Sequence, residues 1–429
     1  MVKKALDIRY YNKPSVILWL SVILFSADSA INAFYPLPLF VSSSPVLIGL
    51  MLTRMEWKSR QPLTPFLLMA LTILSAFINL MRSGFELSNL TDLVFIVLFA
   101  CSWIYYSQNR SEIPAYTLQL LFWMSLILFS FSFFGFDSTA GISEDSIVTD
   151  AVRPRVVPEV TNEISVIEYI RIYRMGLFRL PHIAAYFWLF LSIALAYRLS
   201  QRRSYLTWAA LLLSLFMLVA AGSRTAMVAP LLAIGLVLIE RRKFVLPSLA
   251  ILLLFIVISF RYELLLLSED TVFFQYISLV VTSIDNWNQL SRVMLWKSWS
   301  IEMAGFNWAD WFIGKSFAAS FEANAVNLHF RTWFHNDFLS IAFAYGLPAL
   351  LAYTMIFSEF YRNHRREIQH NAYVSVFFYT MIFAAIFNGY YYYFPVLLLP
   401  LIFIMLRPED ASSLPTNRPP GQAADETGH

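Results

Sequence analysis

The chain has 429 residues, of which 58% are hydrophobic, 17% aromatic and only 14% charged. No soluble domain of this length has such a composition, and the long unbroken apolar runs exclude a β-barrel. The sequence therefore predicts an all-α, polytopic integral membrane protein. The net charge of +3 indicates no particular partner, and we expect no nucleic-acid partner.

About twelve apolar runs follow one another along the chain, each near the ~20 residues that cross the hydrocarbon core. In chain order they cover 15–34, 36–53, 63–81, 89–107, 115–135, 181–199, 205–221, 225–240, 243–261, 337–357, 372–389 and 391–406. The predicted organisation is N-terminal spans (1–135), a loop (136–180), spans (181–261), a long loop (262–335), C-terminal spans (336–406) and a tail (407–429). The tail is Pro- and Ser-rich without apolar content, which is typical of disorder.

Basic residues gather in alternate connections between the spans. The positive-inside bias makes that side cytoplasmic, and it places both termini there and the two long loops on the other side. The basic groups are Lys3/Lys4/Arg9/Lys13, Arg54/Lys58/Arg60, Arg198/Arg202/Arg203, Arg241/Arg242/Lys243 and Arg362/Arg365/Arg366. The first apolar run lacks a small-residue cleavage site, so we interpret it as the first span. The single cysteine, Cys101, lies within an apolar run, so no disulfide is expected.

Arg224 stands in Ala221-Gly222-Ser223-Arg224-Thr225, a polar tip between two apolar runs on the extracytoplasmic side. A cation at a bilayer centre costs about 2.5–3.5 kcal/mol or more, so this residue should face protein or water. Gly222 and Ser223 allow the backbone to bend and offer N–H groups to an anion at a helix start. The alternative is an arginine that snorkels to the membrane surface, although such arginines usually lie on the cytoplasmic side.

Arg292 belongs to the second long loop, in Ser291-Arg292-Val293-Met294-Leu295-Trp296. A guanidinium group matches phosphate oxygens bidentately and stays charged, which favours a phosphate clamp. The alternative is a solvated loop charge.

His335 precedes Asn336 and Asp337, either of which could cap the following span. Imidazole titrates near neutral pH, so His335 is a candidate general base at a helix start just above the membrane. A buried structural histidine is the alternative. The nearby His329 lacks the cap context.

Arg171, Arg174 and Arg179 form a further basic cluster on the extracytoplasmic side. The cluster opposes the charge bias and favours anion binding, with counter-charge for upstream acidic residues as the alternative. No metal-ligand spacing is found, so neither a metal nor a cofactor is expected. Fixed cations and one imidazole on one face together indicate an anionic lipid-linked substrate.

Four sequence segments, in this order, resemble the O-antigen ligase and polymerase family of bacterial envelope glycosyltransferases. The segments are Arg174–His182, Gly222–Ala226, Ser291–Trp296 with Trp311–Phe317, and His335–Leu339 with Tyr345–Pro348. They span about 170–355. His182 stands where asparagine is usual, and Lys315 and Ser316 replace the usual Gly-x-Gly pattern after Gly314.

The resemblance implies a metal-independent, inverting glycosyltransferase of GT-C-like helical architecture in the bacterial inner membrane. Its donor would be a glycan on undecaprenyl diphosphate. Arg224, Arg292 and Arg174 would hold the diphosphate, with Ser223, Asn336 and Arg179 in support. His335 would activate the acceptor hydroxyl.

Three functions stay open from the sequence. A polymerase, which we favour, would add another lipid-linked repeat unit to build O-antigen or exopolysaccharide, with a chain-length regulator as a candidate partner. A ligase would transfer the glycan to lipid A-core or protein. A lipid-linked oligosaccharide flippase fits the span count equally well, but a transporter should bury charges near mid-membrane, and these spans are nearly free of charge.

Overall fold

The computed structural model describes residues 13–31, 39–55, 63–113, 117–132, 181–221, 224–240, 291–329, 332–392 and 395–406. Within these ranges every regular element is a helix. The N-terminal part supplies α3 (Pro14–Ile31), α4 (Leu39–Leu52), α5 (Leu63–Ser83), α6 (Leu87–Gln108), η1 (Arg110–Glu112) and α7 (Thr117–Ser132). Then follow α9 (Pro181–Gln201), α10 (Tyr205–Ala221) and α11 (Arg224–Glu240). The C-terminal part supplies α15 (Ser291–Ala304), α16 (Trp308–Ile313), α17 (Phe317–Leu328), α18 (Asp337–Asn363), α19 (Arg365–His370), α20 (Ala372–Phe387) and α21 (Pro395–Met405).

The predicted apolar runs coincide with helices wherever the structure describes them. Several predicted segments lie outside the described residues: the run 243–261, the loop 136–180, the first part of the second long loop (262–290) and the tail. Four helical segments are long and apolar enough to cross a membrane: Leu63–Ser83, Leu87–Gln108, Ile183–Gln201 and Asp337–Asn363. Seven further apolar helices are shorter. These helices confirm the helical membrane class, whereas the number of twelve spans and the GT-C-like architecture stay predictions.

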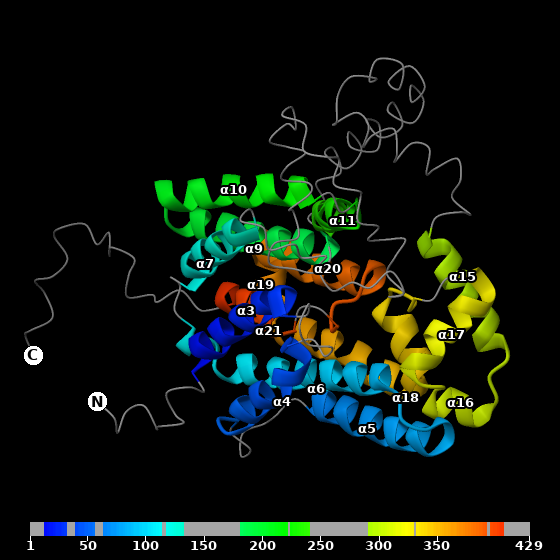
Figure 1. Cartoon of the computed structure of the whole chain (residues 1–429). Coiled ribbons are helices and arrows are strands. Elements are labelled where there is room, and N and C mark those ends of the chain that lie inside the picture. The colour runs from blue at the N-terminus through cyan, green and yellow to red at the C-terminus, as the bar shows by residue number, and fades with distance from the viewer. Residues whose placement is uncertain are drawn as a thin grey trace, which may run out of the picture.

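The C-terminal helix α21 lies in the interior of the bundle, among α3, α6 and α9 (Figure 1). Its residues from Val396 to Leu406 are all buried. Aromatic packing joins α21 to its neighbours: the ring of Trp103 on α6 contacts those of Phe360 on α18 and Phe403 on α21, at centroid distances of 5.2 and 6.4 Å. Close packing of such large rings supplies van der Waals attraction between the helices, which drives helix association where the surrounding solvent is lipid.

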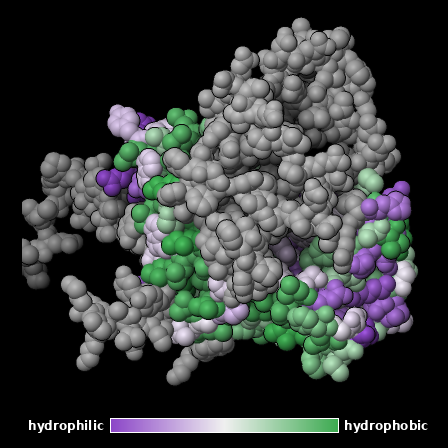
Figure 2. All heavy atoms as spheres, viewed as in Figure 1, coloured by the Kyte–Doolittle hydropathy of each residue, from purple (hydrophilic) through white to green (hydrophobic). Residues whose placement is uncertain are grey.

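The surface differs between the bundle and the segment α15–α17. Figure 2 shows hydrophobic residues over much of the visible face of the bundle and hydrophilic ones gathered over α15–α17. Leu63, Phe77 and Met81 on α5, and Leu212 on α10, are more than half exposed. Apolar side chains on the outside of long apolar helices are expected where the surrounding solvent is lipid.

Contacts between distant segments define two opposite ends of the bundle. At one end Arg54 forms an ion pair with Glu112, and Thr64 donates a hydrogen bond to Glu359 near the end of α18. These residues flank connections that the charge pattern assigns to the cytoplasmic side. At the other end, the backbone N–H of Ala318 donates to Oδ1 of Asn89, 2.7 Å away, close to where α18 begins. The candidate site lies at this second end.

Candidate active site

The start of α18 holds three consecutive polar residues. Asn336 is the N-cap, and its Oδ1 accepts a hydrogen bond from the backbone N–H of Leu339 at 3.1 Å, which confirms one of the two predicted caps. The preceding His335 has a φ of 52°, in the left-handed region that side-chain-bearing residues rarely adopt. Its Nε2 lies 3.1 Å from Oγ1 of Thr332. The half-buried imidazole is thus held on a sharp turn directly before a capped helix.

Asp337 joins this helix start to the connection after α20. Its side chain is fully buried, and its Oδ2 accepts hydrogen bonds from the hydroxyl of Tyr353 and the backbone N–H groups of Tyr390 and Tyr391, at 2.6, 2.6 and 3.1 Å. A buried carboxylate that accepts several hydrogen bonds holds its donors firmly. The carboxylate therefore ties the segment Asn388–Tyr392 to the turn that bears His335.

Gly389 brings the same two segments into direct contact. Its φ is 105°, and a Cβ at this position would overlap the ring of Trp333 and lie 3.0 Å from Oδ1 of Asp337. The ring of Trp333 in turn packs on the imidazole of His335, with centroids 4.7 Å apart. Only glycine allows so close an approach in this backbone conformation.

Arg292 reaches this connection from α15. Its Nη2 donates a hydrogen bond to Oδ1 of Asn388 at 2.8 Å. Asn388 directly precedes Gly389, so the contacts run from Arg292 through Asn388 and Gly389 to Trp333 and His335. The structure thus brings the predicted clamp and the predicted base into one neighbourhood.

The other predicted arginines are less completely described. Arg224 begins α11, which packs along α20, the helix that ends beside Asn388. Its backbone is described, and its side chain lies outside the described residues. Ser223 and the cluster Arg171, Arg174 and Arg179 also lie outside them. Their predicted roles stay predictions.

The turn after Gly314 supports the helix that follows His335. The backbone N–H groups of Lys315 and Ser316 donate to the carbonyls of Phe343 and Ala344 at 2.9 and 3.2 Å. Ser316 has a φ of 90°, so the residue that replaces a glycine of the family pattern still adopts a conformation that favours glycine. Its hydroxyl caps α17 by accepting from the N–H of Ala319.

Residues far apart in the sequence complete the surroundings of the site. Asp92 on α6 is fully buried, and its two oxygens accept hydrogen bonds from the hydroxyls of Tyr345 and Tyr391, at 2.7 and 2.8 Å. No motif in the sequence had indicated Asp92, Asn388 or Gly389 as residues of a functional site. An acidic residue near the start of an apolar span was the one signal that could have indicated Asp92.

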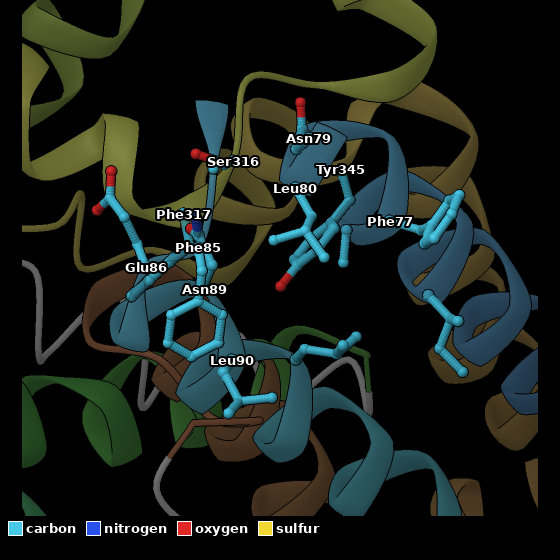
Figure 3. A pocket seen from close by; sticks show the side chains of 14 residues that line it. Phe77, Asn79, Leu80, Phe85, Glu86, Asn89, Leu90, Ser316, Phe317 and Tyr345 are labelled. Atoms are coloured by element: carbon cyan, nitrogen blue, oxygen red, sulfur yellow. The ribbon is translucent and has the colours of Figure 1, made fainter. Parts of the chain in front are cut away.

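An apolar pocket of about 250 Å³ lies beside this site, at the same end of the bundle. Side chains of α5, α6 and the connection between them form its walls, together with Ser316, Phe317 and Tyr345. Figure 3 shows Leu80 and Tyr345 pointing towards the middle of the pocket, with Glu86 at its edge. Phe317 separates the pocket from the candidate site, because its ring also packs on Trp333, 5.9 Å between centroids.

Within the described ranges no three His, Cys, Asp or Glu side chains gather closely enough to hold a metal ion. The ionisable groups in the described part of the site are the guanidinium of Arg292, the carboxyl groups of Asp337 and Asp92, and the ring of His335.

Comparison with known proteins finds similarity between one part of the chain and a family model. Residues 209–354 match the family model described as O-antigen ligase. The match covers most of α10, all of α11 and α15–α17, and α18 as far as residue 354, and therefore includes Arg224, Arg292 and His335. No curated protein matches the chain. The match confirms the resemblance drawn from the sequence segments, and it supports a membrane enzyme of the O-antigen ligase or polymerase type.

Proposed function

We propose that this chain, whose residues 209–354 belong to the O-antigen ligase family, is a metal-independent, inverting membrane glycosyltransferase. It transfers a glycan from undecaprenyl diphosphate to an acceptor hydroxyl on the extracytoplasmic face of the bacterial inner membrane. The observation that carries the proposal is the continuous set of contacts from Arg292 through Asn388 and Gly389 to Trp333 and His335.

In the proposed reaction His335 takes the proton of the acceptor hydroxyl. The acceptor oxygen then forms a bond to the anomeric carbon of the donor sugar, while the bond from that carbon to the diphosphate oxygen breaks. The electron pair leaves with undecaprenyl diphosphate, whose charge increases as the bond breaks. Fixed cations in a partly dry site stabilise such charge, which is the role proposed for Arg292, Arg224 and Arg174.

The contacts of His335 support its assignment as the base. The ring is half-buried, packed on one side by Trp333 and close to a hydroxyl group on Thr332. A base must be held within hydrogen-bonding reach of the hydroxyl that it deprotonates, and a ring on a strained turn between packed residues is held in this way.

The apolar pocket supports the lipid part of the proposal. Its walls are mostly hydrocarbon, and exposed apolar residues of α5 surround it, among them Ile73, Phe77 and Leu80. A hydrocarbon chain could enter such a pocket sideways from the bilayer while the charged group stays at the site.

Polymerisation of lipid-linked repeat units into O-antigen or exopolysaccharide is the function that we favour. The two long loops, each acidic and then basic along the chain, suit two lipid-linked substrates, and a chain-length regulator is a candidate partner. Ligation to lipid A-core is the second candidate, because the matched family is described by that activity.

Deletion of the gene separates the two candidates, provided that the surface polysaccharide and the lipid-linked pool are both resolved by size. A polymerase mutant should carry single repeat units on the final acceptor. A ligase mutant should instead accumulate long polymer on undecaprenyl diphosphate. An unchanged glycan profile would contradict both.

A further inference from the structure

One face of α15 presents two hydrogen-bond donors to the end of α20. Arg292 and Trp296 are four residues apart on this helix, so their side chains lie on the same face, one turn from each other. Arg292 donates to Asn388, and the indole of Trp296 stacks on the ring of Phe387, with centroids 6.3 Å apart and planes inclined by 19°. Two consecutive residues at the end of α20 therefore meet two residues one turn apart on α15.

Two donors in this group have no acceptor within the described part of the chain. Asn388 is fully buried, and its Oδ1 is engaged by Arg292, whereas its Nδ2 has no hydrogen-bond partner among the described residues. The Nε1 of Trp296 is also buried and has no partner there. A buried donor without an acceptor costs about 1–3 kcal/mol, so two of them side by side call for an explanation such as a ligand.

The chemistry of the group identifies that ligand. The guanidinium of Arg292, the amide of Asn388 and the indole N–H of Trp296 are all donors, and indole N–H and guanidinium groups cannot accept. An anion with several oxygens satisfies such a set, and a phosphate group is matched best by a guanidinium combined with neutral donors.

We propose that Arg292, Trp296 and Asn388 form one binding site for the diphosphate of the lipid-linked donor. This inference rests on the proposed function, and it assigns to Trp296 and Asn388 a direct contact with phosphate oxygens. Asn388 has two roles in the site: its Oδ1 orients the guanidinium, and its Nδ2 donates to the anion.

Two conservative substitutions separate anion binding from packing. Trp296→Phe keeps a ring that can stack on Phe387 and removes the N–H. Asn388→Asp keeps an oxygen that accepts from Arg292 and replaces the amide donor by a negatively charged oxygen. A carboxylate at position 388 would also repel the anion, so Asn388→Asp tests whether the anion lies close to this residue, whereas Trp296→Phe, which changes no charge, tests the loss of a donor.

Trp299→Phe is the matched control on the same helix. The Nε1 of Trp299 already donates to the backbone carbonyl of Leu339 at 3.0 Å. Its replacement removes an indole N–H that has a partner within the protein, so it should lower thermal stability without weakening anion binding.

The test measures binding of farnesyl diphosphate, and of farnesol as the uncharged comparison, to the purified full chain in detergent micelles by titration calorimetry. Loss of a hydrogen bond to a charged group should weaken diphosphate binding about ten-fold or more. We expect this loss for Trp296→Phe and for Asn388→Asp, with farnesol binding and the melting temperature near those of the wild type. Trp299→Phe should bind farnesyl diphosphate like the wild type.

Equal binding of farnesyl diphosphate by the wild type and both variants would overturn the inference, as would a wild type that does not distinguish the diphosphate from farnesol. If Asn388→Asp fails to fold, Trp296→Phe alone decides. A chain that binds the diphosphate through these residues but forms no glycosidic bond would leave the site standing and remove the proposed function. If both variants transfer glycan and bind the diphosphate like the wild type, the proposed function stands and the proposed diphosphate site is removed.

Discussion

The backbone segment around Gly314 packs directly against the segment around Gly346. Neither glycine has room for a side chain, because the opposite segment fills the space. A Cβ on Gly314 would overlap the carbonyl group of Ala344, and a Cβ on Gly346 would overlap that of Phe312. Their φ values are 78° and 82°, in the region that favours glycine. This reciprocal contact seats the turn between α16 and α17 on the break in α18, eleven residues after His335.

Alanine at Gly314 or Gly346 should therefore destabilise the protein. Overpacking a close backbone contact costs about 1–3 kcal/mol, and the positive φ adds strain. The expected result is a lower melting temperature in detergent for either variant. Gly235→Ala is the control, because a Cβ there meets nothing within 4 Å. Wild-type melting of the Gly314 and Gly346 variants would show that the two segments do not pack in this way.

Replacement of His335 should abolish transfer while the chain remains folded. Asn is the sharper substitution, because it tolerates left-handed backbone geometry and cannot act as a base near neutral pH. A general base contributes about 100-fold or more to a rate, so we expect at least that loss in glycan formed per unit time. Asn at His329, an exposed residue with a φ of 60° at the end of α17, is the matched control and should stay active. Near-normal activity of His335→Asn would eliminate His335 as the base.

Lysine at position 292 should retain the charge and lose most of the activity. An ammonium group cannot reproduce the planar fork that contacts Asn388 and phosphate together. A decrease of about ten-fold or more in transfer rate is expected, in line with the loss of a charged hydrogen bond. Arginine at the exposed Lys297 on the same helix should have no effect. Wild-type activity of Arg292→Lys would contradict the phosphate clamp and favour the alternative, in which the charge of Arg292 is only solvated.

Substitution of Asp337 should lower the stability of the protein more than substitution of Tyr353. Alanine at Asp337 removes the acceptor of three hydrogen bonds in the interior, and we expect a loss of about 3 kcal/mol or more in stability. Phenylalanine at Tyr353 removes one of these donors and should cost about 1 kcal/mol. Thermal or denaturant unfolding of the purified variants measures both. Equal and small effects would show that the carboxylate does not hold the connection after α20 in place.

The sequence predicts those features of the fold and of the candidate site that depend on local patterns. Apolar runs indicate the helices, and the cap at Asn336 follows from residue type next to an apolar run. Arg292 and His335 stand out because charge and titratable groups are rare in such a composition. Their proximity does not follow from the sequence, because it depends on packing between helices.

The contacts that complete the site join residues too distant in the chain for local reasoning. Asn388 lies 96 residues after Arg292, and Asp92 lies 299 residues before its partner Tyr391. Asn388 looks like an ordinary polar residue at a span end, and only the acidic side chain near the start of an apolar span indicates Asp92. The positive φ of Ser316 is likewise imposed by its hydrogen bond to Ala344, and residue type alone would argue against it.

In the proposed reaction the chain transfers a glycan from a lipid diphosphate, with His335 as the base. The most direct measurement incubates the purified chain with undecaprenyl-diphosphate-linked oligosaccharide and quantifies both the extended lipid-linked saccharide and the released undecaprenyl diphosphate. We expect the wild type to release one undecaprenyl diphosphate for each glycosidic bond formed, and His335→Asn to form neither product. A wild type that releases no undecaprenyl diphosphate when supplied with donor and acceptor, or a His335→Asn variant as active as the wild type, would contradict the proposed reaction.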